Sequence, residues 1–290
     1  ESTSKENRTD RRAEENYLRR TLSIANANVE NYGREVARMQ EDIDEMLARY
    51  HDNDMEVFTI LNNTVTMHTH MKRALERNEK ARNKPYFGRI IFHDEALESV
   101  YIGKGGIAKD TTHWMVVDWR APVANAYYEN NLGKCSYCAP GGVEMKIDLE
   151  LKRTYEIEEG KLLDYFDSEV VANDELLTKY LAKNKEAVLS EIVATIQKEQ
   201  NEIIRKSPYH NVIVQGVAGS GKTTVAMHRI SFILYNYTEK FRPEDFYIVG
   251  SNRILLDYIT GVLPDLDVHG VKQMTMEQLF VRLLYEDWDE

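Results

Sequence analysis

The sequence is poor in cysteine and proline, and it contains no long apolar run. Its two cysteines cannot build a disulfide framework, so we expect a reducing compartment, the cytoplasm. No segment reaches the roughly 18 consecutive apolar residues of a transmembrane helix. The polar N-terminus, from Glu1 to Asn7, also lacks the apolar core of a signal peptide. We therefore expect neither a membrane protein nor a disulfide-rich secreted domain.

Positive charge is scarce as well. The chain has 37 basic and 48 acidic residues, and its formal net charge is −11. A protein that holds nucleic acid along its surface normally shows a basic excess. Any nucleic-acid contact is therefore expected on a local patch or on residues outside this chain.

Residues 10–84, which follow a polar segment (1–9) expected to be a disordered tail, have the pattern of two helices. Between Arg11 and Tyr50, apolar residues recur in steps of four and three, which predicts the seam of a coiled coil. This seam comprises Leu18, Leu22, Ala25, Val29, Tyr32, Val36, Met39, Ile43, Met46 and Tyr50. A weaker seam follows a polar joint, at Val57, Ile60, Thr64, Met67, Met71 and Ala74. The pattern predicts an antiparallel hairpin, with a first arm of about 60 Å.

The hairpin has two interpretations. It is either a packing or dimerisation element, or a probe that projects into a partner with the acidic residues Asp52, Asp54 and Glu56 at its tip. Acidic residues at a helix start are also ordinary capping chemistry, so the tip charge does not decide between the two.

From Pro85 to about residue 170 the composition changes to short β-rich segments separated by glycine-containing turns. We predict a small antiparallel β module here. Within it, Trp119 and Pro122 are expected to pack, while Asp118 and Arg120 either pair with each other or face a partner. Cys135 and Cys138 have the spacing of half a zinc site, but no second pair exists, so two reduced thiols are favoured.

Residues 171–290 alternate helical and strand-like segments, which predicts a parallel α/β sheet. Helices are expected from Asn173 to about Arg205, followed by a strand at Asn211–Val214 and a helix at Thr223–Tyr235. A further strand (Asp245–Val249) and helix (Ile254–Leu263) complete the pattern.

A glycine-rich segment separates the first of these strands from its helix, and it has the G-x-x-x-x-G-K-[ST] pattern of a phosphate-binding loop. Its residues are Gly216, Val217, Ala218, Gly219, Ser220, Gly221, Lys222 and Thr223, with Thr224 next to them. Glycines let backbone N–H groups point at phosphate oxygens, and the following helix adds its positive end. Lys222 is expected to reach the β- and γ-phosphates, and the Thr223 hydroxyl to ligate Mg²⁺. Upstream, Gln200 has a donor and an acceptor that suit the adenine edge, which would select ATP over GTP. By itself, a single glutamine on a helix is more often a solvated polar residue. With adenine read in this way, the expected ligands are ATP and Mg²⁺.

Gln200, the segment Val217–Ile230 and the segment Tyr247–Arg253 resemble the Q motif, motif I and motif Ia of superfamily 1 helicases of the UvrD/Rep type. Within that group the chain resembles the HelD family of RNA polymerase-associated ATPases. The hairpin, the segment Val116–Pro122 (Val-Val-Asp-Trp-Arg-Ala-Pro) and the segment Leu151–Ile157 carry this likeness.

The resemblance implies a RecA-like P-loop domain with ATPase activity, Gln200 at adenine, and Gly216–Thr223 around the phosphates. It also implies nucleic-acid contact by Ser251, Asn252 and Arg253. Two departures weaken the match: Thr224 stands where many such motors have Arg, and Asn-Arg replaces the usual Thr-Asn-Lys of motif Ia.

A complete motor also needs a Walker B Asp-Glu pair. The nearest candidate, Phe280–Asp287, has helical spacing and is expected to be a helix end. We therefore expect an N-terminal portion of a longer enzyme, itself without turnover and monomeric.

The resemblance to the HelD family implies a factor that binds core RNA polymerase and helps to clear nucleic acid from stalled or post-termination polymerase. In this interpretation the tip residues Asp52, Asp54 and Glu56 approach the polymerase channel. The alternatives are a UvrD/Rep-type DNA helicase in repair and a non-catalytic interaction module.

Overall fold

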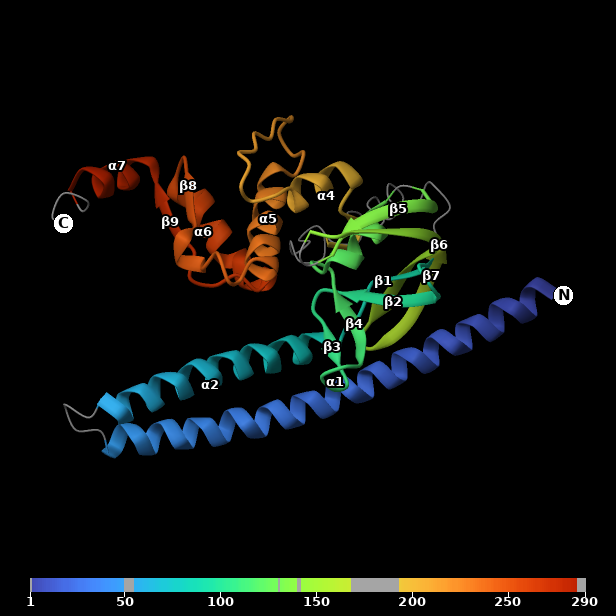
Figure 1. Ribbon diagram of the computed structural model, residues 1–290, viewed down its shortest axis with the longest axis horizontal. Helices are drawn as coiled ribbons and strands as arrows, with labels where there is room; N and C mark the ends of the chain where they lie inside the picture. Colours follow the sequence, from blue (N-terminus) through green and yellow to red (C-terminus); the bar gives the residue numbers. More distant parts are fainter. Residues whose placement is uncertain (1, 50–54, 130, 140–141, 168–192, 286–290) are drawn as a thin grey trace. The chain divides into compact units, whose positions relative to one another are not determined.

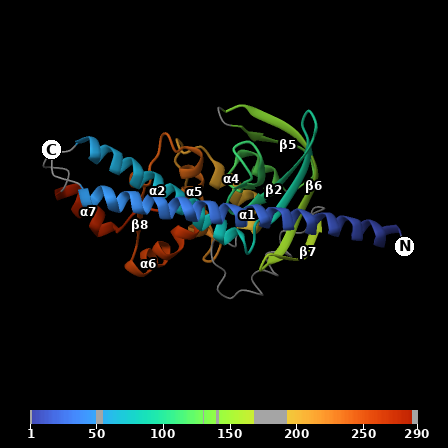
Figure 2. The ribbon, with the colours of Figure 1, turned by 90° about the horizontal axis from the view of Figure 1, so that it is seen from below.

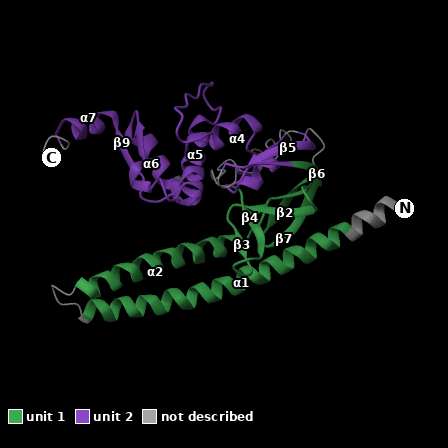
Figure 3. Ribbon diagram, in the orientation of Figure 1, with its two compact units in different colours: residues 1–119, 147–168 green, residues 120–146, 169–290 purple. Residues whose placement is uncertain are grey.

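A computed structural model of the 290-residue chain describes residues 2–49, 55–129, 131–139, 142–167 and 193–285. The chain divides into two compact units (Figure 3). Unit 1 comprises Glu1–Trp119 and Ile147–Ser168, and unit 2 comprises Arg120–Lys146 and Glu169–Glu290. No helix in the described ranges is long and apolar enough to cross a membrane.

Unit 1 begins with a helical hairpin, as the sequence predicts (Figure 1). Helix α1 (Ser2–Arg49) packs along α2 (Met55–Ala81). α1 begins at Ser2, within the segment that we expected to be a tail, and no proline or glycine interrupts it before Gly33. The predicted first seam faces inward, with Leu18, Ala25 and Ile43 buried.

The seam that we predicted for α2 is wrong in part. Ile60 and Met67 are each 50% exposed, whereas the partly buried row runs through Val57, Leu61, Thr64, His68 and Met71. Both rows contain apolar residues at heptad spacing, so the sequence allowed either phase. Nearer the sheet, α2 turns the polar Asn78 inward, and Asn28 Nδ2 donates to its Oδ1 at 3.1 Å. A buried polar pair of this kind fixes the register of two helices.

The hairpin packs on a sheet whose strands are β1 (Gly88–His93), β2 (Leu97–Gly103), β3 (Ile107–Ala108), β4 (Trp114–Asp118), β6 (Glu144–Glu158) and β7 (Lys161–Asp167). In unit 1 the strand order is β3-β4-β2-β1-β6, and β7 also pairs with β6. Seen from below, α1 crosses these strands (Figure 2).

The sheet is mixed, so the prediction of an antiparallel module is wrong for one pair. β2 and β4 are parallel, with Ile102 opposite Val117 and Gly103 opposite Asp118. Three glycines, Gly103 at the end of β2 and Gly105 and Gly106 after it, allow the chain to turn before β3. A Cβ on Gly103 would lie 2.5 Å from the backbone oxygen of Pro85, so only glycine fits this close approach.

The β6–β7 turn ties the sheet to the hairpin. Glu159 and Gly160 both have positive φ, 49° and 69°, as a two-residue type I′ turn requires. Gly160 N donates to the backbone oxygen of Asn83, just beyond α2, at 2.8 Å.

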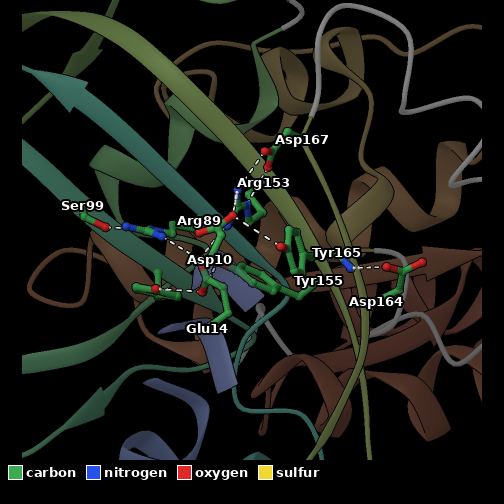
Figure 4. Close-up of polar contacts among 10 residues, drawn as sticks. Asp10, Glu14, Arg89, Ser99, Arg153, Tyr155, Asp164, Tyr165 and Asp167 are labelled. Carbon is green, nitrogen blue, oxygen red and sulfur yellow. Dashed lines mark hydrogen bonds and ion pairs between the residues drawn. The ribbon is translucent and has the colours of Figure 1, made fainter. Parts of the chain in front are cut away.

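A buried carboxylate joins α1 to three strands (Figure 4). Glu14 is 1% exposed. Its Oε1 accepts from Arg89 Nη1 at 2.7 Å and from Arg153 Nη1 at 2.8 Å. Its Oε2 accepts from the hydroxyls of Tyr101 (3.1 Å) and Tyr155 (2.8 Å). Burial, together with the neighbouring Glu14 charge, raises the pKa of both tyrosines above its usual value, so they remain protonated donors.

Arg153 extends this cluster outward. Its Nη2 lies 2.7 Å from Asp10 and 2.8 Å from Asp167. Burial alone would lower the pKa of Arg153, but these hydrogen bonds and charges raise it above its usual value. The same residues surround an apolar core in which Leu18 and Ala25 of α1 pack with Tyr101 and Tyr155 of the sheet and with Tyr86, which precedes β1.

Unit 2 contains helices around a small parallel sheet. Its elements are η1 (Pro122–Tyr128), β5 (Gly133–Cys138), α4 (Lys198–Arg205), α5 (Lys222–Asn236), η3 (Pro243–Asp245), β8 (Tyr247–Gly250), α6 (Arg253–Val262), η4 (Leu263–Leu266), β9 (Lys272–Thr275) and α7 (Met276–Tyr285). β8 and β9 are parallel and are connected through α6, which packs on them. Their apolar cluster includes Met227, Ile248, Leu256 and Ile259.

Two expectations for this half need revision. The predicted strand Asn211–Val214 has no regular secondary structure, and Ile213 is 90% exposed. A central parallel strand needs hydrogen-bonded neighbours, and among the described residues β8 and β9 form a sheet of two strands only. Most of the helical stretch predicted after Asn173 lies outside the described residues; its described end contains α4.

The Glu14 cluster predicts a sharp difference between two neighbouring residues of α1. Replacing Glu14 by Ala leaves the buried guanidinium of Arg153 without its central partner and should lower the free energy of unfolding by about 3–5 kcal/mol. Glu15, 46% exposed in its ion pair with Arg11, is the matched control, and Glu15→Ala should change stability by less than about 0.5 kcal/mol. Urea unfolding of both variants measures the difference, and equal effects would contradict the assignment.

Candidate nucleotide-binding site

The glycine-rich loop leads directly into helix α5. Gly219 and Gly221 have φ of +80° and +82°, a backbone conformation that favours glycine. Gly221 is the N-cap of α5, and Val225 N donates to its carbonyl at 2.8 Å. At the other end of the loop, a Cβ on Gly216 would lie 2.5 Å from Ser220 Oγ. All three glycines of the loop therefore occupy positions where a side chain would strain the backbone or collide with a neighbour.

Lys222 turns back over this loop. Its Nζ donates to the backbone oxygens of Gly216 (2.9 Å) and Val217 (2.8 Å). Val217, Ala218 and Thr223 are exposed, and Thr224 is half-buried. An ammonium group beside free helix-start N–H groups is an arrangement that attracts an anion. The residues present therefore fit a phosphate group.

Gln200 lies beside the loop in the folded chain. It occupies the first turn of α4, where its Oε1 accepts from Gln197 N at 3.1 Å. A Cβ built on Gly221 would lie 3.2 Å from Gln200 Nε2. The structure thus brings together the two parts of the predicted site. That Gln200 reads adenine and that Thr223 binds Mg²⁺ stay predictions.

Helix α4 is held on one side by the segment after Arg120. Asn201, 3% exposed, donates from Nδ2 to Asn125 Oδ1 at 2.7 Å. Lys198 Nζ lies 2.8 Å from Glu129; the resulting hydrogen bond raises the pKa of Lys198. These contacts anchor α4 at Lys198 and Asn201, two residues before and one residue after Gln200.

On another side, α4 is held by α5. Arg229 Nη1 donates to the backbone oxygens of Ile203 (2.9 Å), Ile204 (3.2 Å) and Lys206 (2.6 Å), and its Nη2 donates to Ser207 O (3.1 Å). These carbonyls lie at the C-terminal end of α4, where a helix leaves acceptors unsatisfied. Burial lowers the pKa of Arg229. Sequence reasoning missed Arg229 and Asn125, because an Arg or Asn at helical spacing carries no signal of its own.

Arg120 has a structural position in unit 2. Sequence analysis left open a partner-facing role, but Arg120 is 4% exposed. Its Nη1 donates to Ser231 Oγ at 3.1 Å, Nη2 lies 3.6 Å from Asp267, and the guanidinium lies 4.6 Å from the Tyr235 ring. A residue so enclosed cannot contact a partner directly, so that part of the interpretation is wrong. Asp118, in unit 1, is equally buried, at 4%.

The predicted nucleic-acid contacts lie at the start of α6. Ser251, Asn252 and Arg253 are all exposed. Asn252 is the N-cap of this helix, with Oδ1 accepting from Leu255 N at 2.9 Å. Asn252 therefore has a structural function, whereas Ser251 and Arg253 are accessible for contact.

The hairpin tip is described in part. Asp52 and Asp54 lie outside the described residues, while Glu56 is exposed in the first turn of α2. Large apolar side chains are exposed on the same end of the hairpin: Leu47 (55%), Met55 (77%) and Phe58 (51%).

Two sites set aside on sequence grounds are also located. The Walker B candidate Phe280–Asp287 falls largely in α7, so Phe280–Tyr285 is helical as predicted, and the last two residues lie outside the described ones. Cys135 and Cys138 are free thiols on β5. Within the described part of the chain, no group of three or more His, Cys, Asp or Glu side chains is placed to hold a metal.

Taken together, the described residues define a mixed α/β protein in which a helical hairpin and a mixed sheet precede a glycine-rich loop at a helix N-terminus. A family model described as the DNA helicase IV HelD, N-terminal domain, matches residues 11–201, about two thirds of the chain. The chain therefore belongs to the HelD family. The comparison with curated proteins gave no match.

The matched range covers the hairpin, the β module and Gln200, but it ends before the loop at Gly216–Thr223. The family assignment and the loop geometry are therefore independent observations. Helicase character follows from the family, whereas the prediction of nucleotide binding depends on the loop and stays a prediction.

The capping geometry predicts how Asn252 variants behave. Asn252→Ala removes the acceptor for Leu255 N and should lower the stability of unit 2 by about 1 kcal/mol. Asn252→Asp keeps a good cap and should retain stability. Thermal unfolding followed by circular dichroism tests both variants; an Ala variant as stable as the Asp variant would show that the cap contributes nothing.

Proposed function

We propose that this chain supplies the hairpin, the β module and the beginning of the ATP-dependent motor of a HelD-type helicase. The observation that carries the proposal is the juxtaposition of Gln200 with the loop that ends in Gly221 and Lys222. The chemistry of these groups suits ATP with Mg²⁺, a purine edge at the amide and phosphates at the loop.

In this proposal each residue of the site has a defined part. The backbone of Gly216–Gly221 and Lys222 binds the phosphates, and Thr223 supplies the hydroxyl ligand for Mg²⁺. Bound Mg²⁺ would neutralise phosphate charge. The Lys222 ammonium, which now satisfies the loop's own carbonyls, would exchange those contacts for phosphate oxygens. Because no Walker B pair is found among the described residues after the loop, the chain is expected to bind nucleotide without turning it over.

RNA polymerase is the proposed partner, and clearing nucleic acid from stalled or post-termination polymerase the proposed task. The exposed apolar side chains of Leu47, Met55 and Phe58 at the distal end of the hairpin support a protein-binding role, since clustered exposed apolar groups mark interaction sites. The acidic residues Asp52, Asp54 and Glu56 would meet basic walls or the metal of the polymerase channel.

A DNA helicase is the second candidate, and the name of the matching family, DNA helicase IV HelD, favours it. In that case Ser251 and Arg253 would contact single-stranded DNA, and the hairpin would be dispensable for the main partner. The non-catalytic interaction module explains the hairpin, but it gives no reason for the paired loop and Gln200 geometry.

Nucleotide binding by the loop is tested by Lys222→Ala. Loss of the ammonium should weaken binding of fluorescent mant-ATP in Mg²⁺ at least tenfold, because a charge-assisted phosphate contact is removed. Lys240→Ala changes an exposed lysine of the same unit and should leave affinity within twofold. Equal affinity of both variants would refute the assignment, and multiple-turnover phosphate release abolished by Lys222→Ala would refute the expected lack of turnover.

Polymerase binding is tested by shortening the hairpin. Deleting all of residues 10–84 would remove Glu14, Leu18 and Ala25 from the core of unit 1, so lost binding would be ambiguous. Since Asn28 lies opposite Asn78, residues 38–68 can be replaced by a short Gly-Ser turn that keeps the paired root of the two helices.

The shortened chain should melt within a few degrees of the wild type and lose capture of core RNA polymerase at least tenfold. Undiminished capture would favour the DNA helicase. A second variant, with Asp52, Asp54 and Glu56 all changed to Ala, separates the contribution of the acidic tip from that of the apolar side chains. If this variant competes for the polymerase channel as well as the wild type does, the acidic tip has no role.

A further inference from the structure

Gln200 is held at the loop by contacts that it does not itself make. α4 is a short helix of 8 residues, and isolated helices of this length are unstable in water. Its position next to Gly221 therefore depends on what packs against it. The contacts of Asn125 and Arg229 with α4 are fixed polar contacts, and each meets a different part of the helix.

The geometry of Arg229 is suited to orienting a helix. Gly221 and Arg229 lie eight residues apart on α5, and α4 runs beside this helix (Figure 1). The start of α4 meets Gly221 through Gln200, and its end meets Arg229 through four carbonyls. Two points of contact along one helix fix both its position and its direction.

We propose that Arg229 is a positioning residue that sets the selectivity of the site for adenine by holding α4 so that Gln200 faces the loop. This inference rests on the proposed nucleotide function and deepens it. Arg229 does not touch the nucleotide in this scheme; it acts through Gln200. Lys222 and the loop backbone bind the phosphates whether or not α4 is held.

Because the proposal assigns base selectivity and phosphate binding to different residues, the two can be measured separately. The 290-residue chain is titrated in Mg²⁺ with ATP, GTP and inorganic tripolyphosphate by isothermal calorimetry. One well-placed amide contact corresponds to a selectivity of roughly tenfold. In the wild type we expect ATP to bind about tenfold more tightly than GTP.

Arg229→Met keeps the apolar stem and removes all four donations. It should lower the ATP-over-GTP ratio at least threefold while tripolyphosphate affinity stays within twofold. Arg229→Lys, which can still donate to some of these carbonyls, should retain part of the ratio. Lys240→Met, at an exposed residue beyond the end of α5, is the control and should change nothing.

A double variant distinguishes positioning from general destabilisation. Gln200→Ala alone should abolish selectivity, and adding Arg229→Met should then change the ratio no further. If Arg229→Met fails to fold, as judged by circular dichroism, Asn125→Ala takes its place, because it removes a separate contact on α4 and carries the same expectation.

Several results would overturn the inference. An unchanged ATP-over-GTP ratio in folded Arg229→Met, or equal losses for ATP and tripolyphosphate, would show that Arg229 has no role in selectivity. Equal binding of ATP and GTP by the wild type would show that Gln200 does not select adenine, and it would leave the proposal of nucleotide binding intact. If the wild type binds none of the three ligands, the proposed function itself fails, and this inference fails with it.

Discussion

Taking the carboxylate of Glu14 out of water would cost several kilocalories per mole unless charges and donors replaced its hydration. Four side chains provide that replacement: Arg89 and Arg153 by charge, Tyr101 and Tyr155 by hydroxyl. They come from β1, β2 and β6, so Glu14 can be satisfied only when these strands are paired and α1 lies across them. The position of the first helix on the sheet is therefore determined by polar chemistry as well as by the apolar core around Tyr86.

This constraint changes how the hairpin is understood. Its root is part of the core of unit 1, since Leu18 and Ala25 pack among sheet residues and Asn28 donates to Ala108 O at 3.0 Å. Its distal half has a different character, because Ile60, Val65 and Met67 of α2 are exposed at 50%, 40% and 50%. The root of the hairpin is thus packed into the core of unit 1, while its distal end is apolar and accessible. This combination suits a hairpin that inserts into a partner.

Much of the first half could be predicted from sequence because its signals are local. The heptad spacing of α1 gave its inward face, and Glu159-Gly160 marked the hairpin turn. The seam of α2 could not be settled, since the rows through Ile60 and through Leu61 both contain apolar residues at heptad spacing and only packing on α1 selects one. The parallel pairing of β2 with β4 could not be predicted either, because the pairing direction depends on the path that the chain takes from Gly103 to β4. Glu14, an ordinary glutamate in a charged helix, carried no sign of burial.

In unit 2 the sequence predicted the candidate site but not the contacts that position its residues. The loop and Gln200 stood out because few side chains can perform their expected tasks. Asn125 and Arg229 belong to no motif, and their partners, an amide and four backbone carbonyls, are defined only once the chain has folded. Among the described residues, the predicted strand Asn211–Val214 does not form, and its absence has a physical reason. A parallel strand is stable when neighbours satisfy its N–H and C=O groups on both edges, and β8 and β9 satisfy only each other within the described residues. In keeping with this, Ile213 is 90% exposed. α4 and α5 escape this dependence, because Arg229 and the loop glycines hold them through contacts made within the unit.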